Sequence, residues 1–236
     1  MAESFHVAIL LFPGVTQLDF TGPLEVLQRV PGLRVDLAWK SLDAVECAAQ
    51  AKPGLRVLPT ATLDDLERTD LLLVPGGPGV AALMADDVVL QFLCRMAGSA
   101  RYVTSVCTGS LVLGAAGLLQ GYRATTHWAH AQWLPQLGAT PVAERVVVDR
   151  NRITGAGVTS GIDFALRVIA EIWGERRAQL AQLGLEYDPQ PPFQSGSPSS
   201  APVEIVDSMR ELMKPLTERT GAAVTAVVEQ RRSPRR

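Results

Sequence analysis

Short apolar runs alternate with longer segments of mixed polarity along most of the chain. The runs end at turn-forming residues, as at Pro13-Gly14, and several are rich in β-branched side chains, which is typical of buried strands. Strands are predicted over residues 6–12, 33–39, 55–58, 70–74 and 102–106, and a β-hairpin over residues 145–149 and 152–154.

The segments between these strands carry signals for helices. Thr21 followed by Pro23 favours a helix start, and residues 62–65 match a capping box at the start of a short helix. Residues 87–97 carry apolar side chains at helical spacing, with Gly98 as the expected C-cap. Further helices are predicted over residues 109–119 and after residue 160. Strands that alternate with helices predict an α/β fold with a mostly parallel sheet.

The composition changes near residue 187, which divides the chain into three parts. Residues 5–186 are predicted to form the α/β domain, residues 187–203 a connector rich in proline and serine, and residues 204–236 a helical arm with a basic tail. The arm has amphipathic helical spacing, which Pro215 and Gly221 are expected to interrupt. The sequence therefore predicts one domain with a C-terminal helical extension.

Composition and charge exclude several classes of protein. Of the 236 residues, 47% are hydrophobic and 19% are charged, and the formal net charge is −2, which is unlike a disordered chain. The longest apolar stretches are far below the roughly 18–20 residues of a membrane span, and the N-terminus lacks a basic leader. A cytoplasmic protein without a membrane partner is expected. The basic tail follows an otherwise acidic chain and is interpreted as a solvated terminus, so no nucleic-acid partner is expected.

Three cysteines are too few and too scattered for a disulfide framework or a zinc site, but one of them lies where a nucleophile would. Cys107 directly follows a strand and Gly109 starts a helix, which is the arrangement of a nucleophile elbow with sulfur in place of a hydroxyl. The N-terminus of that helix is expected to favour the thiolate. A small buried side chain is the alternative interpretation of Cys107, and inert packing is the interpretation of Cys47 and Cys94.

Other residues are candidates for the same site. The loop PGGPG follows another strand, and the amides of Gly76 and Gly77 are expected to be bare and, with that of Thr108, to form an oxyanion hole. A tight turn or a phosphate cradle would also fit this loop. Asp19 lies in an apolar stretch, where an acid is buried only with a partner, and helix capping is the alternative. His127 follows a short strand and is expected either beside the sulfur or in a structural hydrogen bond.

Five segments together resemble the ThiJ/PfpI superfamily across residues 5–186. In chain order they are LLFPGVTQLDFTGPLEV, LLLVPGGPGV, RYVTSVCTGSLVLGAAGLL, ATTHWAH and GVTSGIDFAL. The resemblance implies the flavodoxin-like fold of class I glutamine amidotransferases, a mostly parallel sheet with helices on both faces. It also implies that Cys107 is the nucleophile, Asp19 the acid/base carboxylate and Thr108 a supporting hydroxyl, in a homodimer without a metal or organic cofactor.

The segment SVCTGSLVLGAAGLLQG, which continues into ATTHW, is similar to members of the superfamily that hydrate isonitriles. This similarity implies an isonitrile as the small-molecule substrate and an N-substituted formamide as the product, through a cysteine adduct with help from the carboxylate. Many members carry glutamate at the position of Asp19. The protease-like branch carries histidine directly after the cysteine, so Thr108 in that place counts against peptidase chemistry.

Three alternatives stay open. A glyoxalase-like cysteine enzyme of the same superfamily, acting on 2-oxoaldehydes, ranks second. A redox sensor would use Cys107 as a thiolate that oxidises readily beside a carboxyl group. A ligand-binding domain of an AraC-like regulator would continue into a helix-turn-helix region of about 100 residues, for which the arm after the connector is too short.

Overall fold

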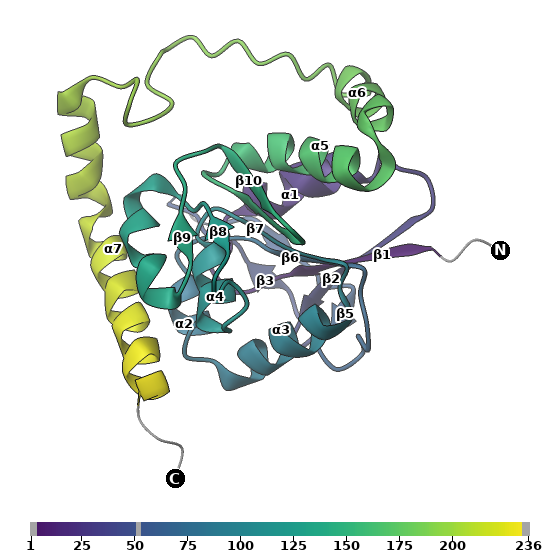
Figure 1. The fold of residues 1–236 in the computed structure, drawn as a ribbon, viewed down its shortest axis with the longest axis horizontal. Coiled ribbons are helices and arrows are strands. Elements are labelled where there is room, and N and C mark those ends of the chain that lie inside the picture. Colours follow the sequence, from purple (N-terminus) through teal and green to yellow (C-terminus); the bar gives the residue numbers. More distant parts are fainter. Residues whose placement is uncertain (1–3, 51–52, 233–236) are drawn as a thin grey trace.

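The computed structural model describes residues 4–50 and 53–232, in which helices enclose a central sheet (Figure 1). The sheet has seven strands in the order β10-β11-β7-β6-β1-β2-β5. Their bounds are Phe5–Leu10 for β1, Leu33–Trp39 for β2, Ala61–Thr62 for β5, Leu71–Val74 for β6, Tyr102–Val106 for β7, Val146–Asp149 for β10 and Arg152–Gly155 for β11. Neighbouring strands are parallel except β10 and β11, which form the predicted hairpin. The mostly parallel, flavodoxin-like sheet is confirmed.

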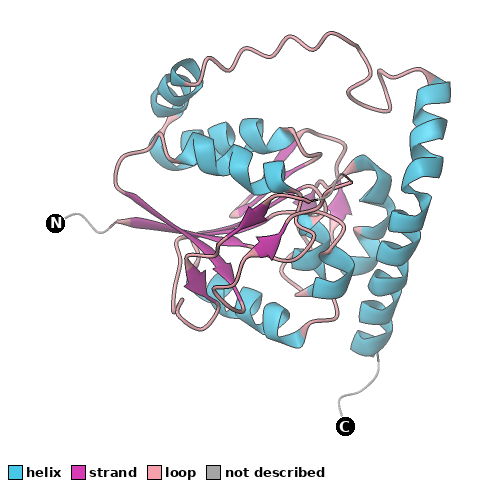
Figure 2. Ribbon diagram, turned by 180° about the vertical axis from the view of Figure 1, so that it is seen from behind, coloured by secondary structure: helices cyan, strands magenta, loops and turns pink. Residues whose placement is uncertain are grey.

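Helices cover both faces of this sheet (Figure 2). On one face lie α1 (Gln17–Leu27) and α5 (Ser160–Trp173), followed by α6 (Glu175–Gly184); on the other lie α2 (Val80–Leu83), α3 (Asp87–Ser99) and α4 (Gly109–Ala115). Two small sheets, β3 (Val45–Glu46) with β4 (Arg56–Val57) and β8 (Arg123–Ala124) with β9 (Thr140–Pro141), lie outside the main one. The 3₁₀ helices η1 (Trp128–Trp133) and η2 (Pro135–Leu137) lead to β9, and α7 (Val203–Arg232) runs along the side of the molecule.

The core lies between the sheet and these two helical layers. All four residues of β6 and the last four of β1 are buried, as expected of parallel strands covered on both faces. Phe92 and Met96 of α3 are buried, as the helical spacing predicts, and Phe164 of α5 is buried too. The core therefore fixes the carboxyl ends of the central strands, where ligands of open α/β sheets bind.

Helix α1 begins at Gln17, so the predicted start at Thr21 is wrong. Thr21 lies inside the helix and its hydroxyl donates to the Gln17 carbonyl at 2.9 Å. Pro23 is also inside the helix, where it cannot donate to the carbonyl four residues earlier. The earlier start places Asp19 in the first turn of α1.

Three other predicted helix boundaries are corrected. Residues 62–65 form only a turn, because Thr62 belongs to β5, although the Asp65 carboxylate does accept from the Thr62 amide at 2.8 Å. Helix α3 continues through Gly98 to Ser99, and α4 ends at Ala115 instead of residue 119.

The predicted interruption of the C-terminal helix is also wrong, because α7 is one continuous helix of 30 residues. Pro215 is exposed and removes only one backbone hydrogen bond. Gly221 faces η1, and a Cβ there would lie 2.4 Å from Trp133 Cζ2. The glycine thus allows the two elements to approach closely. No helix in the described part of the chain is long and apolar enough to cross a membrane.

Candidate active site

Cys107 lies on a sharp turn between β7 and α4, at the carboxyl end of a central strand. Its φ is +56°, which is rare outside glycine and costs of order 1–3 kcal/mol, so the surroundings must hold it. The Cys107 amide donates to the Gly155 carbonyl at 3.0 Å, and its carbonyl accepts from the Thr126 hydroxyl at 3.0 Å. A Cβ on Gly109 would lie 2.0 Å from the Val74 carbonyl oxygen, so only glycine fits after the turn. The geometry is that of a nucleophile elbow.

Asp19 is fully buried beside this turn. Its Oδ2 accepts from the Gly76 amide at 2.9 Å, and its Oδ1 has no hydrogen-bond partner among the described residues. A Cβ on Gly76 would lie 2.9 Å from Asp19 Oδ2 and 2.5 Å from the Thr108 nitrogen. Gly76 therefore occupies the point where the carboxyl group, the elbow and the end of β6 meet.

The carboxyl group of Asp19 and the thiol of Cys107 alter each other's titration. Burial raises the pKa of Asp19 to about 7, against smaller opposing effects of the Gly76 amide and the Cys107 side chain. Burial, and then the negative charge of Asp19, raise the pKa of Cys107 well above its usual range. The amide and hydroxyl of Thr108, at the start of α4, lower that pKa, but their effect is smaller than that of burial. The prediction that the helix N-terminus favours the thiolate is therefore wrong for the site without substrate. Above neutral pH the pair therefore carries one proton, which lies on the Cys107 sulfur, and below neutral pH Asp19 binds a second.

The glycine loop supports the site through amides that already have partners. The Gly77 amide donates to the Thr108 hydroxyl at 3.0 Å, and the Gly76 amide donates to Asp19. The prediction that both amides are bare is therefore wrong. Of the three predicted oxyanion donors, only the amide of Thr108 acts on the Cys107 sulfur, whose pKa it lowers together with the Thr108 hydroxyl.

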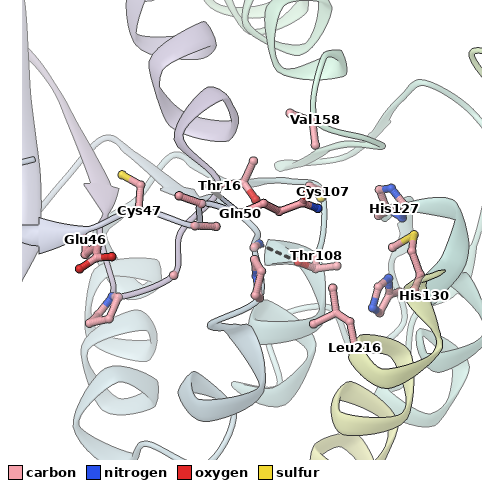
Figure 3. Close-up of a pocket in the computed structure, with 17 residues that line it drawn as sticks. Thr16, Glu46, Cys47, Gln50, Cys107, Thr108, His127, His130, Val158 and Leu216 are labelled. Carbon is pink, nitrogen blue, oxygen red and sulfur yellow. Dashed lines mark hydrogen bonds between the residues drawn. The ribbon is translucent and has the colours of Figure 1, made fainter. Parts of the chain in front are cut away.

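The sulfur opens onto a cavity of about 700 Å³ (Figure 3). Its walls come from the glycine loop, from the segment around Cys47, from η1 and from α7. The lining residues are Pro13, Gly14, Thr16, Glu46, Cys47, Ala48, Ala49, Gln50, Gly77, Pro78, Cys107, Thr108, His127, His130, Val158, Met213 and Leu216. This size is within the usual range for small-molecule sites.

His127, a predicted candidate, reaches this cavity together with a histidine that the sequence analysis did not single out (Figure 3). The Nδ1 of His127 accepts from the Ala129 amide at 3.4 Å, and burial lowers its pKa. His130 is 1% exposed, and neither ring nitrogen has a hydrogen-bond partner in the described chain. Burial, followed by the charge of His127, lowers the pKa of His130 to about 4. The spacing of three residues could have indicated the pair, because side chains at i and i+3 lie above each other in a 3₁₀ helix.

The other two cysteines lie in different surroundings. Cys47, expected to be inert packing, is buried in the cavity wall, and burial raises its pKa. Cys94 is exposed, so its interpretation as a packed side chain is wrong. Its thiol donates to the Ala116 carbonyl at 3.4 Å. Within residues 4–50 and 53–232, no three His, Cys, Asp or Glu side chains form a group that could hold a metal ion.

A cysteine on a strained turn at the carboxyl edge of a parallel sheet, beside a buried carboxyl group, defines a class of α/β proteins with a cysteine nucleophile elbow. The DJ-1/PfpI family matches residues 5–171. The chain belongs to this family.

Three relatives show how far the similarity extends. The isonitrile hydratase of Pseudomonas putida is 52% identical over 226 residues, which cover 93% of this chain and 97% of that protein. The crystal structure of a ThiJ/PfpI family protein from Pseudomonas syringae is 43% identical, with a TM-score of 0.89 over 94% of this chain and 90% of that one. The glutathione-independent glyoxalase DJR-1.2 of Caenorhabditis elegans is 28% identical over 180 residues, 75% of this chain and 94% of that protein.

Proposed function

We propose that the protein is an isonitrile hydratase, a lyase that adds water to R–N≡C and releases R–NH–CHO without a metal or organic cofactor. The observation that carries the proposal is the 52% identity to an isonitrile hydratase over 93% of the chain. The proton-sharing pair of Asp19 and Cys107 supplies chemistry that fits this reaction, because the isonitrile carbon must accept both a proton and a nucleophile.

In the first step the Cys107 sulfur attacks the terminal carbon of the isonitrile. Asp19, with a pKa of about 7, accepts the thiol proton and passes it to the same carbon. The product is a thioimidate, R–N=CH–S–Cys107, in which one C–S bond and one C–H bond have formed. The thiol does not need to be ionised beforehand, because its base is already in contact with it.

In the second step Asp19 accepts a proton from water, and the resulting hydroxide adds to the thioimidate carbon. The nitrogen takes that proton, and the C–S bond breaks as the carbonyl forms. Sulfur leaves as a thiolate, takes up the proton of the carbon-bound hydroxyl, and the formamide departs. The Thr108 amide and hydroxyl, which favour a charged sulfur, stabilise this leaving thiolate.

We assign supporting roles around the pair to the glycine loop and to two histidines. Gly76 positions Asp19 by its amide, and Gly77 orients the Thr108 hydroxyl. Burial lowers the pKa values of both His127 and His130, so at neutral and alkaline pH they act as uncharged hydrogen-bonding groups in the cavity.

Isonitrile hydration is distinguished from glyoxalase activity by one assay. The purified protein is incubated in parallel with cyclohexyl isonitrile and with methylglyoxal, and formamide and lactate are quantified. We expect formamide from the isonitrile at a rate far above that with methylglyoxal. Lactate formation without formamide would instead favour the glyoxalase alternative, to which the 28% identical relative belongs by name.

We also propose a cytoplasmic homodimer. The exposed Cys94 carries a free thiol, which persists more readily in a reducing compartment.

Large exposed apolar side chains lie over α6, the connector and the start of α7, which is typical of a protein interface; they include Leu180, Leu183, Phe193, Ile205 and Leu212.

A further inference from the structure

Helix α7 lies beyond the part of the chain that the DJ-1/PfpI family matches, which ends at residue 171. It runs along one side of the molecule and packs against η1, η2 and α2 (Figures 1 and 2). Since α7 accounts for 30 of the 236 residues, the match to the isonitrile hydratase over 93% of the chain must extend into it. The match to the glyoxalase covers only 75% of the chain.

Polar and apolar contacts fix the position of α7 on the domain. Arg219 donates to the Pro78 carbonyl in the glycine loop at 3.1 Å, and Arg231 donates to the carbonyls of Gly114 and Ala115, both at 2.7 Å. Between these anchors Val224 is fully buried. The helix is therefore held at its middle, beside the cavity, and at its C-terminal end.

Two side chains of α7 reach the cavity that contains the nucleophile. Met213 and Leu216, both half-buried, line it together with Cys107, His127 and His130. Figure 3 shows Leu216 on the side of the cavity where His130 also lies. Leu216 precedes Arg219 by one turn, so the anchor on the glycine loop holds this wall in place.

We propose that Met213 and Leu216 form the wall that contacts the R group of the isonitrile, so that α7 sets the size of R that the enzyme accepts. The inference rests on the proposed function. When the terminal carbon lies at the sulfur, R extends away from the elbow into the cavity. There the thioether and isobutyl groups of α7 offer apolar surface, which matches an apolar aliphatic R.

The proposal is tested with a series of isonitriles of increasing size, namely methyl, cyclohexyl and adamantyl isonitrile. Leu216→Trp narrows the cavity and should lower the ratio of kcat/KM for cyclohexyl over methyl isonitrile by about tenfold, the effect of a mismatch of this size in an apolar pocket. Leu216→Ala and Met213→Ala should raise the ratio of kcat/KM for adamantyl over cyclohexyl isonitrile. Ala222→Trp is the matched control, because Ala222 is exposed on the same helix and does not line the cavity.

Folding of each variant is checked by circular dichroism and thermal unfolding. An unchanged size profile in Leu216→Trp, Leu216→Ala and Met213→Ala would overturn the proposal, as would an equal change in Ala222→Trp. A parent protein that makes no formamide from any isonitrile would instead refute the proposed function.

A second readout does not depend on activity. Alkylation of Cys107 by N-methylmaleimide and N-cyclohexylmaleimide is followed by peptide mass spectrometry. Leu216→Trp should slow the reaction with the cyclohexyl reagent selectively, whereas Ala222→Trp should not. Equal slowing with both reagents, or none, would show that α7 does not set the size of the pocket.

Discussion

Asp19 and Cys107 occupy a site where the protein, and not bulk water, determines which group carries the proton. Both side chains are buried. Asp19 lies in the first turn of α1, and Cys107 lies on the elbow after β7. Removing either partner breaks the proton path from sulfur to the isonitrile carbon.

Cys107→Ala should abolish formamide production, and Asp19→Asn should lower kcat by at least about 10²-fold, the usual contribution of a positioned acid/base group. Initial rates with cyclohexyl isonitrile measure both effects. Cys94→Ala, which changes an exposed thiol outside the cavity, is the control and should keep full activity. Full activity of Cys107→Ala would rule out covalent catalysis.

The pH dependence should follow the shared proton. Below a pH of about 7 Asp19 becomes protonated while Cys107 is still a thiol, so no base remains for the sulfur. We expect kcat/KM to fall about tenfold per pH unit below this pH, and to stay level above it until the thiol ionises. A profile of kcat/KM from about pH 5 to about pH 9, corrected for spontaneous acid hydrolysis, measures this. A loss of activity between neutral and mildly alkaline pH would contradict the assignment.

Asp19 should also make the fold less stable as pH rises. Its pKa is 3.8 when unfolded and about 7 when folded, so its stabilising contribution is complete below the lower value and is lost as pH rises through the upper one. At pH 8, Asp19→Asn should therefore raise the free energy of unfolding by up to roughly 4 kcal/mol, at about 1.4 kcal/mol per pKa unit. Urea unfolding at acidic and at alkaline pH measures the change.

The exposed Asp64 provides the control for this experiment. Asp64→Asn also removes one carboxyl group, but from the surface, and its unfolding is measured at the same two pH values for comparison. If Asp19→Asn lost stability at alkaline pH, the carboxylate would be stabilised by the site, contrary to the burial that we describe.

The elements of the fold differ in how much of them local sequence determines. β1, β7 and the β10–β11 hairpin agree with prediction within a residue or two, because their buried, β-branched runs and bounding turns are local signals. The continuity of α7 was not predictable, because Gly221 is favourable there only through its contact with Trp133, which is distant in sequence. Pairing Asp19 with Cys107 required a resemblance to a family, since no spacing connects positions so far apart.

Because Gly221 packs against a neighbouring element, replacing glycine by alanine should have opposite effects on stability in α7 and in α3. Gly221→Ala should destabilise the protein by about 1–3 kcal/mol, because its Cβ would overlap the Trp133 ring. Gly98→Ala in α3 meets no atom within 4 Å and should stabilise by about 0.5–1 kcal/mol. Unfolding midpoints in urea compare the two. A stable Gly221→Ala protein would show that α7 is able to move away from η1 without cost.

At the scale of the whole molecule, apolar side chains that one chain leaves exposed predict its assembly. Most of the large ones lie along α6, the connector and the N-terminal part of α7. We expect light scattering after size exclusion to give about twice the chain mass of 25.3 kDa. A mass of one chain at micromolar concentration would contradict the homodimer.

Helix α7 lies outside the residues that the family matches, so chemical reactivity and the choice of substrate depend on different parts of the chain. The reactive thiol and its carboxyl partner belong to the common fold, whereas the wall facing the R group belongs to a helix added after it. A combinatorial library limited to the inner positions of α7 should therefore yield enzymes with new substrate ranges, and each would inherit the same reactive centre.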